Sequence, residues 1–192
     1  MKVTFLFTPL LALFLFLSAC SDSRLDDYSD VSFELTNQNG EPVLFPDDFR
    51  GAPLVVGFIY TYCPDICSFI TANIQKVYEQ IDNPGDAQFV LITFDPDRDT
   101  PDMLKHYAQA FEMDREPFTF LTGDSETIDA LMQRVSVRTS VSDERTTESG
   151  DTIYFLSHSD KILLIDSNSR LVFDYGGSMT PPNLIAEDFS KL

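Results

Sequence analysis

The stretch that decides the fold of this chain is Leu54-Val55-Val56-Gly57-Phe58-Ile59-Tyr60-Thr61-Tyr62-Cys63-Pro64-Asp65-Ile66-Cys67. Its first half is apolar and rich in β-branched residues, which is typical of a buried strand. Its second half carries two thiols separated by three residues, and a helical pattern follows. We expect that helix to begin around Pro64, with Cys63 at its N-terminus and Cys67 in its first turn, so that the two sulfurs face one another. The helix N-terminus would lower the pKa of Cys63.

Strands and helices alternate along the rest of the chain. Apolar runs and apolar alternation predict strands over 31–35, 41–44, 54–60, 88–94, 118–121, 161–166 and 171–175. Helical spacing predicts helices over 69–81 and 125–134, a third that begins at Thr100-Pro101-Asp102 and ends near Phe111, and a last one from about Pro182. Residues 138–152 are rich in Thr, Ser, Asp and Glu, and they predict an exposed, mobile loop.

This order of elements indicates an α/β, thioredoxin-like fold: a central mixed sheet flanked by helices on both faces, with an N-terminal β-hairpin extension. Strands 54–60 and 88–94 should be parallel, with helix 69–81 as a right-handed crossover. Strand 161–166 should run antiparallel to both. Cys63, Asp95 and His158, which flank these strands, would then meet at one edge of the sheet, where α/β proteins usually bind ligands.

Two thiolates and one imidazole form a soft ligand set. Thiolates suit Cu(I), and an added imidazole also accommodates Cu(II). Zinc accepts the same groups, but a structural zinc site usually takes four protein ligands. A purely structural disulfide is disfavoured, because closing a loop of three residues gains little entropy. The second histidine, His106, lies within the predicted helix that ends near Phe111, and we expect it at the surface.

The segment Asp95-Pro96-Asp97-Arg98-Asp99-Thr100-Pro101 permits two interpretations. In the functional one, Asp95, Arg98 and Asp99 tune the thiols or contact a partner. In the structural one, Asp99 and Thr100 cap the following helix while Arg98 pairs with a nearby carboxylate. The capping pattern favours the structural interpretation.

The N-terminus carries export features. Lys2 and an apolar run over 10–17 predict a signal peptide over residues 1–19, and the run is too short to span an ordinary bilayer. Leu17-Ser18-Ala19-Cys20 resembles the bacterial lipobox, which implies lipidation at Cys20 and a membrane anchor on the extracytoplasmic, periplasmic face. The anchor is compatible with either the inner or the outer membrane. Residues 20–30 would be a flexible tether and 31–192 the folded domain.

The chain is strongly acidic, with a formal net charge of −18. Removal of residues 1–19 takes away only Lys2, which leaves −19. Such a charge argues against nucleic acid and against electrostatic binding to anionic lipid. It is compatible with a basic partner, and equally with solubility or a saline habitat.

Three segments in order resemble the Sco/SenC family of copper chaperones: Cys63-Pro64-Asp65-Ile66-Cys67, the Asp95–Pro101 segment, and His158 before an apolar strand that ends in Asp166. The resemblance covers about residues 30–190. It implies a membrane-tethered, thioredoxin-like protein that binds copper through Cys63, Cys67 and His158. It also implies delivery of copper to the binuclear copper centre of cytochrome c oxidase, or reduction of the cysteines of that centre. The implied partners are the apo form of the copper-bearing oxidase subunit and other periplasmic copper carriers or thiol reductants.

Two functions therefore compete. The first is a metallochaperone, which holds and transfers copper without catalytic turnover. The second is a thiol–disulfide reductase, in which Cys63 attacks a target disulfide, Cys67 resolves the mixed disulfide and His158 only assists. A peroxidase or redox sensor is the weakest candidate, because no further residue pattern supports peroxide activation.

Overall fold

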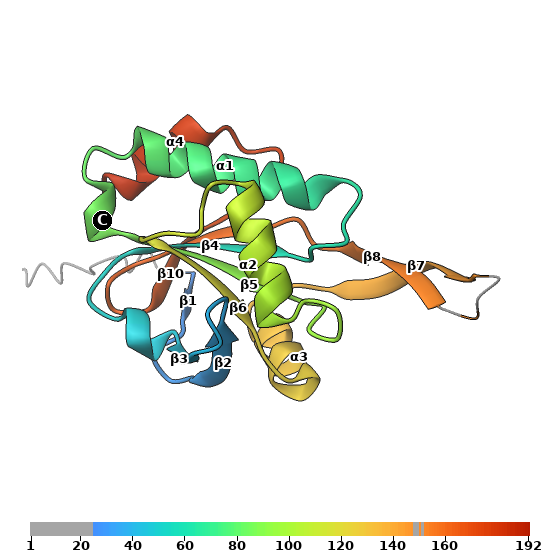
Figure 1. Cartoon of the computed structure of the whole chain (residues 1–192). Helices are drawn as coiled ribbons and strands as arrows, with labels where there is room; N and C mark the ends of the chain where they lie inside the picture. The colour runs from blue at the N-terminus through green and yellow to red at the C-terminus, as the bar shows by residue number, and fades with distance from the viewer. Residues whose placement is uncertain (1–24, 148–149, 151) are drawn as a thin grey trace, which may run out of the picture.

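An eight-stranded mixed sheet forms the centre of the protein (Figure 1). The computed structural model describes residues 25–192 except 148, 149 and 151. The strands of the sheet are β1 (Asp26–Asp27), β2 (Phe33–Asn37), β3 (Pro42–Phe45), β4 (Leu54–Ile59), β5 (Gln88–Thr93), β6 (Phe118–Thr122), β9 (Ile162–Ile165) and β10 (Arg170–Tyr175). Their order across the sheet is β1-β10-β9-β4-β5-β6-β2-β3.

The pairing of the central strands agrees with the sequence-based prediction. β4 is parallel to β5 and antiparallel to β9, and β5 is parallel to β6. All residues of β4 are buried, because β4 lies in the middle of the sheet with side chains packed on both faces. The predicted N-terminal hairpin is also present: β2 and β3 pair antiparallel, and β2 joins the sheet through β6.

Four helices flank the sheet: α1 (Ile66–Gln80), α2 (Pro101–Ala110), α3 (Ser125–Arg134) and α4 (Pro182–Phe189). Figure 1 shows α1 and α4 together on one face and α3 on the opposite face. α2 packs beside α1, and the hydroxyls of Tyr107 and Thr71 lie 2.9 Å apart across that contact. Single-turn 3-10 helices cover Asp47–Phe49 and Pro84–Asp86. No helix in the described part of the chain has the length and apolar run needed to cross a membrane.

Helix α1 begins two residues after the start expected at Pro64 and three residues before the range 69–81 that helical spacing predicted. Its first residue is Ile66, so Cys63 and Pro64 belong to the loop that follows β4. Phe69, the first residue of the predicted helix 69–81, is 60% exposed. The buried face instead follows Ile70, Ile74 and Val77, and Phe69 lies about 100° away from Ile70 around the helix.

The expected loop over 138–152 is the largest error of the sequence analysis. Most of this segment forms a hairpin of β7 (Thr139–Thr146) and β8 (Thr152–His158), which projects away from the main sheet (Figure 1). Nearly all side chains of β7 face solvent, so no apolar alternation marks this segment in the sequence. His158 is consequently the last residue of a strand and not part of a loop before one.

The folded domain begins earlier in the sequence than the expected residue 31. Asp26 and Asp27 pair with β10, and Tyr28 is 2% exposed. The guanidinium of Arg134 bonds the Asp26 carboxylate and lies 4.6 Å from the centre of the Tyr28 ring. Residues 26–28 therefore belong to the domain, and a tether would have to end before them. The predicted signal peptide over 1–19 and Cys20 lie outside the described residues.

Candidate metal centre

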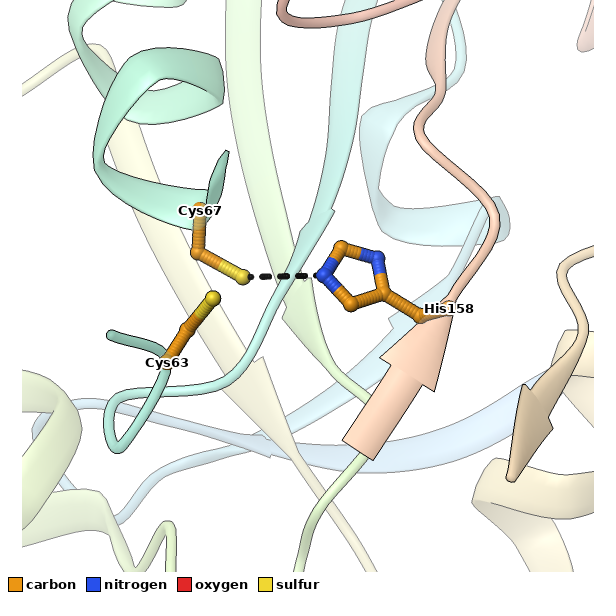
Figure 2. Close-up of side chains that lie close together, drawn as sticks. All are labelled: Cys63, Cys67 and His158. Atoms are coloured by element: carbon orange, nitrogen blue, oxygen red, sulfur yellow. Dashed lines mark hydrogen bonds between the residues drawn. The ribbon is translucent and has the colours of Figure 1, made fainter. Parts of the chain in front are cut away.

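Cys63, Cys67 and His158 converge at the edge of the sheet where β4 ends. Cys63 lies in the loop after β4, Cys67 is the second residue of α1, and His158 ends β8. The two sulfurs and one imidazole nitrogen all lie within 4.8 Å of one another. In Figure 2 both sulfurs point toward the imidazole, and the Cys67 sulfur lies 3.4 Å from Nε2 of His158. Both cysteines are free thiols.

A buried carboxylate holds the loop that carries Cys63. One oxygen of Asp99 accepts hydrogen bonds from the Thr61 amide at 3.0 Å and from the Thr93 hydroxyl at 2.5 Å. The other accepts from the Thr61 hydroxyl at 2.5 Å. Asp99 is fully buried, so these bonds replace the water it loses. The end of β5 and the approach to Cys63 are thereby fixed to each other.

The imidazole of His158 is oriented by its other nitrogen. Nδ1 lies 2.9 Å from the carbonyl oxygen of Ser159. A carbonyl only accepts, so Nδ1 donates to it, and Nε2 is the nitrogen that faces the cysteines. The ring also packs against Phe94, with ring centres 4.6 Å apart, and against Tyr60 at 5.9 Å. These contacts fix the ring with Nε2 beside the sulfurs.

The pKa values of the two thiols are shifted in opposite directions. The pKa of Cys63 falls to about 3, chiefly because the Cys67 thiol donates a hydrogen bond to the Cys63 sulfur, with a further contribution from His158 and against an opposing effect of burial. The pKa of Cys67 rises, because the Cys63 charge favours the bonded proton on Cys67 and burial opposes a second charge. Burial lowers the pKa of His158, but hydrogen bonds to Cys63 and Ser159 outweigh it and the net shift is upward. A metal bound by both sulfurs must therefore displace the Cys67 proton.

The three donors suit a thiophilic metal. Two thiolates match Cu(I), and the added imidazole matches Cu(II). In the part of the chain that the structure describes, no further cysteine or histidine joins them. The remaining described histidine, His106, is exposed on α2, as expected. Three ligands are fewer than a structural zinc site usually has.

The Asp95–Pro101 segment supports the structural interpretation in part and the functional interpretation in part. Thr100 caps α2, since its side chain accepts from the Met103 amide, and Arg98 pairs with Asp95 at 2.5 Å, both as expected. Asp99 does not cap the helix and instead holds the cysteine loop.

Sequence reasoning missed three aromatic residues next to the site: Tyr60, Phe94 and Tyr154. Tyr60 and Phe94 directly follow β4 and β5 and share their edge of the sheet, which was a usable signal. Tyr154 lies just beyond the expected loop over 138–152, in the apolar run Ile153-Tyr154-Phe155-Leu156, for which no element was predicted.

Fold and site together define a class: a thioredoxin-like protein whose cysteine pair and distant histidine form a site for a soft metal or for thiol chemistry. The chain belongs to the SCO1/SenC family, whose model matches residues 21–192. An SCO2-like protein of Rickettsia prowazekii is 35% identical over 139 residues, which is 72% of this chain and 64% of that protein. The chain thus spans less than two thirds of that relative's length.

Two solved structures are similar in sequence and fold. The copper-bound ScoI of Bradyrhizobium japonicum is 28% identical with a TM-score of 0.70, over 84% of this chain and 97% of that one. A SCO1/SenC family lipoprotein of Bacillus anthracis is 32% identical with a TM-score of 0.67, over 84% of this chain and 93% of that one. The predicted thioredoxin-like fold and family are therefore confirmed.

Proposed function

We propose that this protein binds copper through Cys63, Cys67 and His158 and delivers it to the binuclear copper centre of cytochrome c oxidase during assembly. The observation that carries the proposal is the convergence of two sulfurs and one imidazole nitrogen within 4.8 Å. The copper-bound relative from Bradyrhizobium japonicum supports copper as the metal. The recipient of the copper would be the apo form of the copper-bearing oxidase subunit. Other periplasmic copper carriers would supply copper to this protein.

The geometry suits transfer by ligand exchange. Cys67 is buried, whereas Cys63 is partly exposed. An incoming thiolate of the partner would therefore displace Cys63 first and Cys67 last. In this scheme copper is the cargo, and the chain supplies a soft ligand set that is open on one side.

A second candidate is a thiol–disulfide reductase, and the opposite pKa shifts of the two thiols favour it. The partly exposed Cys63 thiolate would attack a target disulfide, form a mixed disulfide and release one target thiolate. Cys67, after loss of its proton, would attack the Cys63 sulfur and release the second target thiolate. The protein would end as a Cys63–Cys67 disulfide, and an external thiol reductant would have to restore it.

Copper titration of the reduced domain, residues 21–192, distinguishes the two. A copper carrier takes up about one equivalent and shows a sulfur-to-copper(II) charge-transfer band. His158→Ala should abolish stable Cu(II) binding but spare most disulfide reduction. Absence of both the band and equimolar uptake in the unmodified domain contradicts the carrier function.

The protein would work as a lipoprotein on the periplasmic face of a membrane, anchored through Cys20. Support comes from the sequence Leu17-Ser18-Ala19-Cys20 and from the Bacillus anthracis relative, a SCO1/SenC family lipoprotein. Cys20→Ser should abolish incorporation of labelled fatty acid and move the protein out of the membrane fraction. Unchanged labelling in this variant argues against the anchor.

A further inference from the structure

His158 is attached to the site through a separate piece of structure. The cysteines belong to the β4–α1 connection within the main sheet, whereas His158 ends β8 in the two-stranded hairpin. The relative position of sulfur and imidazole therefore depends on how the hairpin is fixed to the domain. Tyr154, Leu156 and His158 alternate along β8 and share its inner face, which is half-buried.

Arg98 binds the hairpin at Tyr154. Its Nη1 donates a hydrogen bond to the Tyr154 carbonyl at 2.9 Å, and its guanidinium carbon lies 3.6 Å from the centre of the Tyr154 ring. Its Nε donates to Asp95 at 2.6 Å. One side chain thus stacks on β8 and donates a hydrogen bond to it while it pairs with Asp95, a combination that suits the planar guanidinium.

Asp95 closes this cluster. One of its oxygens accepts from Arg98, and the other accepts from the Tyr154 hydroxyl at 2.7 Å. The side chain of Asp95 is 4% exposed, so the ion pair is shielded from water. Closer to His158, the Tyr60 hydroxyl accepts from the Leu156 amide at 3.2 Å and lies 3.3 Å from its carbonyl oxygen.

The loop after β5 therefore holds both halves of the site. Asp99 fixes Thr61 ahead of Cys63, while Asp95 and Arg98 fix Tyr154 four residues before His158. Release of the hairpin would leave the cysteine pair intact and let the imidazole move away from it.

We propose that Arg98, Asp95 and Tyr154 are positioning residues for the metal centre. They hold His158 against the cysteine pair, and this selectively supports Cu(II), which needs the imidazole, over Cu(I), which two thiolates can bind alone. The inference rests on the proposed copper-binding function. It assigns a function in the site to a cluster that otherwise contributes only to the stability of the fold.

The test measures copper affinity in the Arg98→Gln variant and in the unmodified domain 21–192. Cu(II) affinity is measured by titration with a copper(II) salt, and Cu(I) affinity by competition with a chromogenic Cu(I) chelator. We expect Cu(II) affinity to fall by about 10- to 100-fold, as for other residues that orient a ligand, while Cu(I) affinity changes by less than about two-fold. Arg98→Lys should give an intermediate loss, because an ammonium can pair with Asp95 but cannot stack and fork in the same way. Tyr154→Phe, which removes only the hydroxyl, is a milder second variant in case Arg98→Gln folds poorly.

Arg115→Gln is the matched control. Arg115 also stacks on a tyrosine and bonds its hydroxyl, with 5.0 Å to the Tyr78 ring centre and 3.2 Å to its oxygen. We expect no change in copper binding.

Amide hydrogen exchange of the metal-free domain tests the positioning without copper. Exchange at Leu156 should become at least about tenfold faster in Arg98→Gln but not in Arg115→Gln. Unchanged exchange and unchanged Cu(II) affinity overturn the inference, and so does an equal loss of Cu(I) and Cu(II). Failure of the unmodified domain to bind copper contradicts the proposed function instead, and the exchange data still decide whether the cluster holds the hairpin.

Discussion

At the scale of single residues, the two cysteines of the site are not equivalent. Cys67 is 1% exposed, whereas Cys63 is partly exposed. The thiol of Cys67 donates to the sulfur of Cys63, so the negative charge concentrates on the more accessible atom. The first contact with a metal, a partner or an alkylating agent should therefore occur at Cys63.

Iodoacetamide should consequently alkylate Cys63 well before Cys67 in the reduced, metal-free domain. Because the pKa of Cys63 lies far below neutrality, its thiolate persists as the pH falls, and the rate should be nearly constant between about pH 5 and 8. Peptide mapping by mass spectrometry gives the rate at each sulfur.

Cys67→Ala is the informative control for this reactivity. It removes the hydrogen bond that contributes most to the low pKa of Cys63, so the pKa should rise and alkylation should slow as the pH is lowered. Equal reactivity of both sulfurs in the unmodified domain, or a steep pH dependence there, contradicts this account of the pair.

At the scale of elements, the close approach of α1 to β4 brings Cys67 over the end of the strand. Gly57 makes that approach possible: a Cβ at this position would lie 2.4 Å from the Cδ1 of Ile74 and 3.2 Å from the Cγ2 of Ile70. Both isoleucines are fully buried, so they have little room to move. The spacing between strand and helix thus depends on the absence of one methyl group.

Gly57→Ala should destabilise the domain by about 1–3 kcal/mol through overpacking. The measurement is urea unfolding followed by circular dichroism. Gly85→Ala serves as the control, since a Cβ there meets nothing within 4 Å, and its effect should stay within about 0.5 kcal/mol. Equal stability of the two variants would show that α1 can shift away from β4 without cost.

At the scale of the whole molecule, the short strand β1 covers the outer edge of the sheet. It pairs with β10, and it leads into the buried Tyr28. Arg134 at the end of α3 holds Asp26 and stacks on Tyr28, so the N-terminal segment connects the sheet edge with a helix. A protective cover of this kind also keeps the edge from pairing with other chains.

A fragment of residues 31–192 should therefore be less stable than one of residues 21–192, by about 2 kcal/mol or more, chiefly from the lost burial of Tyr28. Thermal and urea unfolding of the two fragments give the difference. Asp26→Asn in the longer fragment should cost less, because the ion pair is partly exposed.

The contribution of Asp26 should also depend on pH. The hydrogen bond from Arg134 lowers the pKa of Asp26, so its stabilising effect is present above about pH 4 and is lost as the pH falls through the lowered value. Equal stability of the fragments 31–192 and 21–192 contradicts the structural role of β1.

Much of the fold could be predicted, because local patterns encode it. β4, β5 and α3 stand within a residue of their expected bounds, since each has a strong apolar run or helical spacing. The hairpin β7–β8 was not predicted, since the mostly polar side chains of β7 face solvent and carry no periodic signal, although the apolar run over 153–156 was a local sign of β8. The start of α1 was misplaced because Pro64 favours a first helical position that the cysteine loop does not use.

The family, the order of the central strands and the approach of Cys63, Cys67 and His158 to one sheet edge could all be predicted from the amino-acid sequence, because they follow from local pattern and chain topology. How His158 is held, and what Asp95, Arg98 and Asp99 do, became visible in the folded structure alone. Their partners, Thr61 and Tyr154, lie 38 and 56 residues away along the chain. Contacts of that range depend on how separate elements pack, and no local pattern records them.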